Sequence, residues 1–256
     1  MRDIDEEQAR PVPGAVGVYQ AFWSPDNQFI GYSDCGFRPG CGLVRIPVQG
    51  GTAVLITKLG GSFRRANWSS DGETIVYCDT IGMYTIPARG GSPTLILKHP
   101  HIEHPSFLDL PRGRRAFLYA AVDPDRPGGH GIYVQVVGED RRRLVTMSSS
   151  GNPYPAYSTT GHIIYVDGSA DVGTIMALPF SLATLQASGK AFPIAEHAST
   201  PQVSRTGTLV YSDSPSGRLQ LAWVDRSGNT LSTVGEPFRQ KQSGVVAGWP
   251  QAGGAG

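Results

Sequence analysis

The sequence predicts an all-β fold built from repeated units of four short strands, and three observations support this prediction. A phrase of twelve residues occurs twice, as AFWSPDNQFIGY at residues 21–32 and as ANWSSDGETIVY at residues 66–77. Its tryptophans, Trp23 and Trp68, are 45 residues apart, a period typical of circular repeat folds. The chain of 256 residues contains 33 glycines and 20 prolines, as a fold with many tight turns requires. The predicted architecture is therefore a β-propeller.

Each copy of the phrase is followed by a second half with two more predicted strands. The first copy continues with GLVRIPVQGG at 42–51 and AVLIT at 53–57, and the second with GMYTIPARGG at 82–91 and PTLIL at 93–97. The Asp-Asn, Asp-Gly and Gly-Gly pairs between these segments accept the positive φ that tight hairpins require. One unit is therefore expected to form a four-stranded blade.

Three later units are weaker but keep the same phase. The third unit contains HPSF at 104–107, RAFLY at 115–119, GIYVQVV at 131–137 and RLV at 143–145. The fourth contains YPAYS at 154–158, HIIYV at 162–166 and TIMALPF at 174–180, and the fifth contains PQVS at 201–204, LVY at 209–211, QLAWVDRSG at 220–228 and LSTV at 231–234. The five predicted blades, each of about 44 residues, are 18–57, 58–98, 99–147, 148–196 and 197–237.

The remaining segments extend this prediction to the whole chain. Residues 1–13 lie where the outer strands of a preceding blade would be, so residues 1–238 are predicted to be part of a ring of six or seven blades. Residues 239–256 are rich in glycine and alanine and are expected to be a disordered tail. Phe180–Ala187 is the one short segment with helical spacing.

Charge and hydropathy argue against several classes of partner. The 22 basic and 21 acidic residues leave a net charge of +1, so we expect no nucleic-acid partner. The N-terminus is acidic and polar, unlike a signal peptide, and no window reaches the roughly 18 apolar residues of a membrane span. We therefore expect no direct membrane insertion by this chain, and its compartment stays open.

Three cysteines do not make a disulfide framework in a chain of this length. Cys35 and Cys41 flank the loop at 36–40 and would form one local bridge in an oxidising compartment. A zinc site is disfavoured, because the pair is too widely spaced and Cys78 lies one blade away. Free thiols are the favoured interpretation, the local disulfide is the alternative, and no metal or other cofactor is expected.

The repeated phrase is interpreted as architecture. Asp26 and Asp71 are expected to accept backbone N–H groups in the turn, while Gly72 takes the positive φ. Recurrence favours a structural role, because a catalytic acid is needed once in each site. Aromatic residues at matching places are expected to fill the wedges between blades; they are Trp23, Trp68, Tyr32, Tyr77, Tyr119, Tyr165 and Tyr211.

Candidate binding residues lie where one blade passes to the next. The segment KHPHIEHP at 98–105 has the densest group of potential ligands; if it is extended, His99, His101 and Glu103 project to one side and His104 to the other. Its two prolines favour a polar, irregular connecting loop instead. Polar and aromatic character on the predicted ligand-facing side selects five candidate binding residues: His101, His104, Tyr154, Tyr157 and Gln202.

Motifs of common enzymes are absent. The chain has no Gly-x-Ser-x-Gly nucleophile elbow, no phosphate-binding loop, and neither the catalytic-loop nor the metal-binding motif of a protein kinase. We therefore expect a non-catalytic module without catalytic residues. It is predicted to bind a protein or peptide at its rim, with a small ligand in the central channel as the next candidate.

Two sets of segments resemble known propellers. The phrases at 21–32 and 66–77 resemble the Trp-Ser-Pro-Asp-Gly repeat of TolB-like propellers, which are similar to WD repeats but distinct from them. ARPVPG at 9–14, GMYTIPARGGSPTLI at 82–96 and LVYSDSPSGRLQLAWVDRSGNTLSTVGEP at 209–237 resemble the propeller of certain bacterial serine/threonine protein kinases. This resemblance implies a sensor or docking part, often located outside the membrane, and assigns no kinase activity to these residues.

Two other interpretations stay open. A gating or accessory propeller of a serine peptidase would have the same fold, and a hydrolase domain encoded downstream would distinguish it. A truncated product without independent function would expose unpaired strand edges and self-associate.

Overall fold

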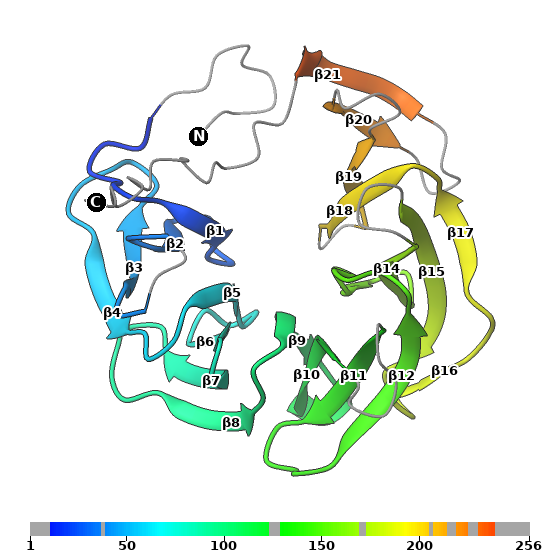
Figure 1. Cartoon of the computed structure of the whole chain (residues 1–256), viewed down its shortest axis with the longest axis horizontal. Coiled ribbons are helices and arrows are strands. Elements are labelled where there is room, and N and C mark those ends of the chain that lie inside the picture. Colours follow the sequence, from blue (N-terminus) through cyan, green and yellow to red (C-terminus); the bar gives the residue numbers. More distant parts are fainter. Residues whose placement is uncertain are drawn as a thin grey trace, which may run out of the picture.

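The computed structural model describes residues 11–36, 39–122, 129–168, 173–204, 207–213, 219–224 and 230–238. Its strands form successive antiparallel sheets arranged around a central axis (Figure 1). The predicted all-β propeller of four-stranded blades is confirmed. Within the described ranges the single helical element is a 3-10 turn at Pro111–Gly113, and no helix is long and apolar enough to cross a membrane.

The strands of each blade follow one another in chain order, starting from the inner strand (Figure 1). Blade 1 contains β1 (Tyr19–Trp23), β2 (Phe29–Ser33), β3 (Gly42–Pro47) and β4 (Val54–Lys58), and blade 2 contains β5 (Phe63–Trp68), β6 (Thr74–Asp79), β7 (Gly82–Pro87) and β8 (Thr94–Lys98). Blade 3 contains β9 (Ile102–Asp109), β10 (Arg115–Val122), β11 (His130–Val136) and β12 (Arg142–Ser148). Blade 4 contains β13 (Ala156–Ser158), β14 (His162–Gly168), β15 (Gly173–Ser181), β16 (Gln186–Ala187) and β17 (Phe192–Ala195), and blade 5 contains β18 (Ala198–Val203), β19 (Leu209–Asp213), β20 (Leu219–Val224) and β21 (Thr230–Phe238). Blade 4 thus has a fifth strand, β17, which pairs with β15 beside the short β16.

The repeated phrase forms the turn between the first two strands of blades 1 and 2. Asp71 Oδ1 accepts hydrogen bonds from the hydroxyl of Ser69 and from the backbone N–H of Glu73, and the N–H of Thr74 donates to Ser69 Oγ. Gly72 has a φ of 77° in this turn. Asp26 accepts the same pair of hydrogen bonds in blade 1, from Ser24 and Gln28. These local hydrogen bonds explain why the two turns need the same short polar residues.

Aromatic side chains fill the space between neighbouring blades, although Trp23 does not follow the expectation. Trp68 is 6% exposed and packs against Phe22 of the preceding blade, with ring centroids 5.2 Å apart. Trp23 is 48% exposed, because it belongs to the first described blade and has no described blade before it in the chain. The other expected aromatic residues are buried or half-buried: Tyr32, Tyr77, Tyr119, Tyr165 and Tyr211.

One local expectation is wrong, and one candidate is settled. The segment Phe180–Ala187, the short candidate for helical spacing, is not helical, in agreement with the all-β prediction; it reverses direction, so that Phe180 pairs with Ala187 as β15 meets β16. Cys35 and Cys41 form a disulfide instead of free thiols, because the loop between β2 and β3 brings their Cα atoms within 5.4 Å. Cys78 is a free thiol, and its burial raises its pKa.

The expectations for the chain ends fall largely outside the described residues. Residues 1–10 of the proposed outer strands at 1–13 are among those not described, as is the whole tail at 239–256. A ring of six or seven blades therefore stays a prediction.

Candidate functional site

The inner strands carry backbone irregularities at matching places. Register shifts interrupt the pairing of β1, β5, β9 and β18 with the second strand of their blades. At equivalent positions Gln20, His104, Tyr154 and Thr200 have φ values of 53°, 50°, 48° and 50°. The left-handed region is costly for residues other than glycine, and such strain is concentrated at functional sites. Arg65 occupies the equivalent position in blade 2, three residues before Trp68.

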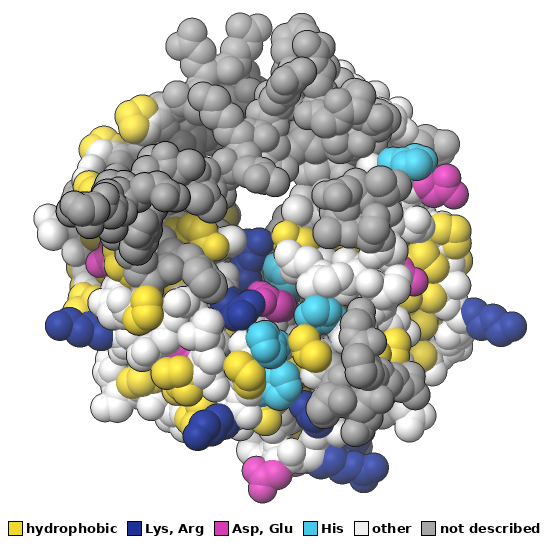
Figure 2. Space-filling model, viewed as in Figure 1, with side chains coloured by type: hydrophobic (Ala, Val, Ile, Leu, Met, Phe, Trp, Pro, Cys, Tyr) yellow, Lys and Arg dark blue, Asp and Glu magenta, His cyan; other side chains and the backbone are white. Residues whose placement is uncertain are grey.

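Three blades bring polar and aromatic side chains together near the axis. The His104 ring lies against the Tyr154 ring, with centroids 4.0 Å apart, and the Arg65 guanidinium carbon lies 5.5 Å from the Tyr154 centroid. His104 Nε2 donates a hydrogen bond to Asn152 Oδ1. These residues come from β5, from β9 and from the segment that leads into β13. Figure 2 shows histidine, basic and acidic side chains gathered beside the central opening.

An ion pair completes this group of residues. Arg64 Nη1 donates to Glu103 Oε1, and the two side chains are only 20% and 17% exposed. Burial raises the pKa of Glu103, and the positive charge of Arg64 partly offsets this effect. We refer to Arg64, Arg65, Glu103, His104, Asn152 and Tyr154 as the central cluster.

The imidazoles of this region favour the neutral form. Burial lowers the pKa of His104 to about 3, with a further contribution from the positive charge of Arg65. Burial also lowers the pKa values of His99 and His130. His130 Nδ1 is buried and accepts or donates no hydrogen bond in the described part of the chain. With a neutral imidazole, the formal charges of the central cluster are those of its two arginines and one glutamate, which sum to +1.

The predicted binding residues are not all part of this cluster. His104 and Tyr154 meet within it. His101 lies at its edge: residues 100–101 form a turn, so the alternating directions expected for an extended segment do not apply, and the backbone N–H of His101 donates to His99 Nδ1 over 3.2 Å.

Tyr157 and Gln202 lie elsewhere. The Tyr157 ring packs against Phe180, with centroids 6.4 Å apart, in the apolar cluster between blades 3 and 4. Gln202 is exposed, and its side-chain amide donates to the carbonyl oxygen of Pro201. Sequence reasoning missed Arg64, Arg65 and Asn152, although the two arginines immediately precede the second copy of the repeated phrase.

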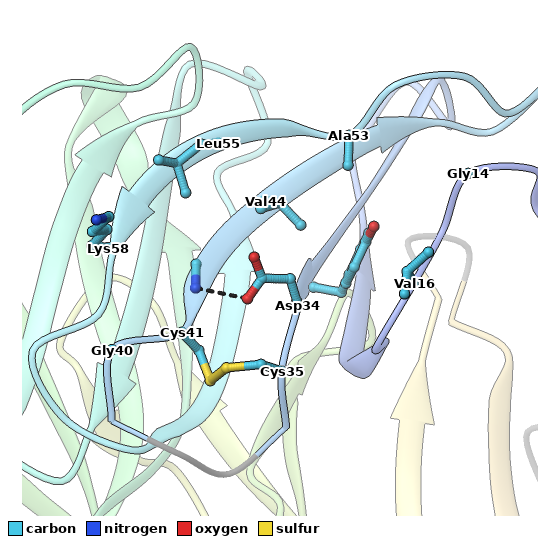
Figure 3. A pocket seen from close by; sticks show the side chains of 12 residues that line it. Gly14, Val16, Asp34, Cys35, Gly40, Cys41, Val44, Ala53, Leu55 and Lys58 are labelled. Atoms are coloured by element: carbon cyan, nitrogen blue, oxygen red, sulfur yellow. Dashed lines mark hydrogen bonds between the residues drawn. A yellow bond between two sulfur atoms is a disulfide. The ribbon is translucent and has the colours of Figure 1, made fainter.

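A separate cavity of about 560 Å³ lies beside blade 1 (Figure 3). Its walls include the disulfide between Cys35 and Cys41, the carboxylate of Asp34 and the side chain of Lys58. Asp34 Oδ1 accepts a hydrogen bond of 2.8 Å from the backbone N–H of Gly42. Asp34 and the two cysteines are the one described group with three potential metal ligands in close proximity, but both sulfurs are in the disulfide and are not thiolates. The central cluster has more polar groups that converge on one point.

The comparisons with known proteins support the fold. Neither a protein-family model nor a curated protein sequence matches this chain. The structure of TolB from Acinetobacter baumannii superposes with a TM-score of 0.65 at 18% identity, over 87% of this chain and 56% of that chain. The chain thus spans little more than half the length of that protein.

Two enzymes have similar structures. A gluconolactonase from Xanthomonas campestris superposes with a TM-score of 0.59 at 15% identity, over 89% of this chain and 79% of that chain. A puromycin-hydrolyzing peptidase from Mycobacterium tuberculosis gives a TM-score of 0.58 at 10% identity, over 86% of this chain and 39% of that chain. The chain therefore has the fold of TolB-like and other β-propellers, a fold that occurs both with and without catalytic activity.

Proposed function

We propose that this chain is a non-catalytic binding propeller and that its central cluster receives a protein or peptide partner. One observation carries the proposal: three separate blades direct Arg65, His104 and Tyr154 to one point near the axis. Two of these residues have a strained backbone that only the surrounding structure maintains. Arginine and tyrosine are also the residue types that dominate binding hot spots.

The chemistry of the cluster favours recognition over catalysis. His104 is neutral, and its Nε2 is engaged by Asn152, so this nitrogen is not available as a general base. Glu103 is held by Arg64 in an ion pair. The similar gluconolactonase and peptidase do not alter this argument, because function depends on the site and not on the fold.

We further propose that the module is the sensor or docking part of a protein related to bacterial serine/threonine kinases. The segments 82–96 and 209–237 support this relation through their resemblance to kinase-associated propellers. The disulfide between Cys35 and Cys41 supports an oxidising compartment, as expected for an extracytoplasmic sensor. Sequencing of the genomic region tests the relation: a kinase domain and a hydrophobic span encoded upstream would support it. A downstream hydrolase domain would favour the peptidase accessory propeller, for which the similar peptidase structure is the supporting observation.

Peptide selection tests the binding function directly. A random dodecapeptide display library is panned against the purified chain, and the affinity of each selected peptide is measured for the wild type and for Tyr154→Ala. We expect at least about a tenfold loss of affinity, because the ring lies at the centre of the proposed site. Phe192→Ala is the matched control, since Phe192 is an exposed aromatic residue on β17.

Two results would contradict the proposed function. One is that no peptide is selected. The other is that the selected peptides bind Tyr154→Ala as tightly as the wild type, provided that circular dichroism shows both proteins to be folded.

A further inference from the structure

We propose that the central cluster recognises a carboxylate group of its peptide partner and that Arg65 is the residue that receives it. This inference rests on the proposed binding function and adds the chemical class of the ligand.

Among the described residues, Arg65 is a cation that forms no ion pair. In contrast, Arg64, Arg114 and Arg115 pair with Glu103, Glu139 and Asp71. The side chain of Arg65 is half-buried. Its positive charge opposes the burial that raises the pKa of Glu103, and it adds to the burial that lowers the pKa of His104. A carboxylate is a favourable ligand for a partly buried arginine, because the planar guanidinium binds it through two parallel hydrogen bonds.

Tyr154 holds this guanidinium in place. The ring lies beneath the guanidinium carbon at 5.5 Å, and the His104 ring supports the same tyrosine at 4.0 Å. A contact with a ring satisfies none of the five N–H donors of arginine, so these donors stay available to a ligand. His104 is itself fixed by Asn152, which makes the support of Tyr154 rigid. The site is thus organised before the ligand arrives, which reduces the entropy cost of binding.

The remaining charges disfavour a cationic ligand. Glu103 is the carboxylate of the cluster, and Arg64 already occupies it. His104 is neutral, so it contributes no opposing charge. A positively charged group would therefore be repelled by Arg65 and would find the Glu103 charge already paired with Arg64. A carboxylate would be attracted by the net formal charge of +1 in this partly desolvated site.

Titration with acetate tests the inference without a peptide. Arginine Nε–Hε signals are recorded by NMR while sodium acetate is added to the wild-type chain, with sodium chloride at equal ionic strength as the baseline. We expect the Arg65 signal to shift and saturate, and the Arg45 signal to stay in place. Arg45 is the matched control, because its guanidinium carbon lies 4.9 Å from the Phe29 centroid in blade 1. Acetamide, the neutral analogue, is expected to shift neither signal.

The peptides selected against the wild-type chain supply the second arm. Each is resynthesised with an amidated C-terminus, and separately with its Asp and Glu residues replaced by Asn and Gln. One of these changes is expected to weaken binding at least tenfold, and it identifies the terminal or the side-chain carboxylate as the group recognised. Arg65→Gln is expected to weaken binding of the unmodified peptide to a similar extent, and the modified and unmodified peptides should then bind this variant equally. Arg45→Gln is expected to change neither the affinity for the unmodified peptide nor the effect of the peptide modification.

Failure of this inference differs from failure of the proposed function. If peptides bind in a Tyr154-dependent manner but neither amidation, nor removal of acidic residues, nor Arg65→Gln alters their affinity, the carboxylate inference is overturned and the binding function stands. An acetate titration that leaves the Arg65 signal unchanged also contradicts the inference. If no peptide is selected, the binding function itself is overturned, and with it a peptide as the source of the carboxylate.

Discussion

At the residue scale, aspartates fasten the second strand of a blade to the segment that leads into that blade. Asp79 is fully buried at the end of β6, where its carboxylate accepts hydrogen bonds from the N–H groups of Gly61, Ile81 and Gly82. It thereby ties the turn after β6 to the segment that enters the blade. Asp167 makes the corresponding bonds in blade 4. These residues stand two positions after Tyr77 and Tyr165 of the repeat, so the spacing is visible in the sequence.

The first prediction concerns Asp79. Replacing it with alanine leaves three backbone N–H groups without their acceptor, so Asp79→Ala should lower the free energy of unfolding by about 2–3 kcal/mol or more. Urea unfolding monitored by fluorescence gives the value. Asp26→Ala is the control. Among the described residues, Asp26 accepts hydrogen bonds only within its own turn, so this substitution should lower the free energy of unfolding by less than Asp79→Ala does. An equal loss in the two variants would argue against the joining role of Asp79.

The second prediction concerns pH. Burial raises the pKa of Asp167, but its hydrogen bonds with Ser149, Gly168 and Ser148 outweigh this effect, and the pKa is lowered overall. A lowered carboxyl pKa in the folded state stabilises the fold above the unfolded pKa of about 3.9, and the contribution disappears as the pH falls through the folded value. Thermal unfolding of Asp167→Asn should therefore depend less on pH than that of the wild type below about pH 4. Parallel curves for the two proteins would contradict this assignment.

At the element scale, non-glycine residues with a left-handed φ recur in the inner strands or directly before them. Gln20 and Thr200, in blades 1 and 5, have left-handed φ values like those of His104 and Tyr154. The irregularity therefore belongs to the inner strands of several blades, and the residue at this position determines what each blade presents near the axis. In blades 2, 3 and 4 these residues are Arg65, His104 and Tyr154, which form the proposed site.

The third prediction tests this backbone strain. Gln20→Val should lower the free energy of unfolding by about 1–2 kcal/mol, because a β-branched residue is disfavoured at a φ of 53°. Gln20→Gly should not destabilise the protein to this extent, since glycine adopts positive φ without steric cost. Differential scanning calorimetry of the two variants provides the comparison. If valine is tolerated as well as glycine, the position is not strained.

At the scale of the whole molecule, stability arises between the blades as well as within them. An aromatic contact between blades 1 and 2 joins Phe22 to Trp68. Trp23, at the same place in the repeat as Trp68, leaves nearly half of its surface exposed. Two tryptophans at the ends of equivalent strands thus differ in burial, because Trp68 packs against the preceding blade and Trp23 has no described blade before it in the chain.

The fourth prediction follows from this difference. Trp68→Ala should lower the free energy of unfolding by about 3–5 kcal/mol, the usual cost of removing a buried large aromatic side chain. Trp23→Ala should cost clearly less, because about half of its ring is already in water. Guanidinium unfolding monitored by circular dichroism measures both. A similar cost for the two substitutions would show that Trp23 is covered in solution.

The sequence by itself determined the architecture. Strand patterns and turn residues act over a few neighbouring positions, so the repeated phrase was sufficient to predict four-stranded blades and an all-β propeller. Two of the five candidate binding residues, His104 and Tyr154, also belong to the central cluster, because the crossings between blades are recognisable from the phase of the repeat.

Which side chains lie together near the central axis depends on the tertiary structure. Arg65, His104 and Tyr154 are about 40 to 50 residues apart in turn, and only the curvature of the ring brings their strands together. The exposure of Trp23 and Tyr157 likewise depends on the neighbouring blade. The disulfide of Cys35 and Cys41 depends instead on the local geometry of the loop between β2 and β3. Contacts between distant segments depend on how the blades pack against one another, which no local sequence pattern specifies.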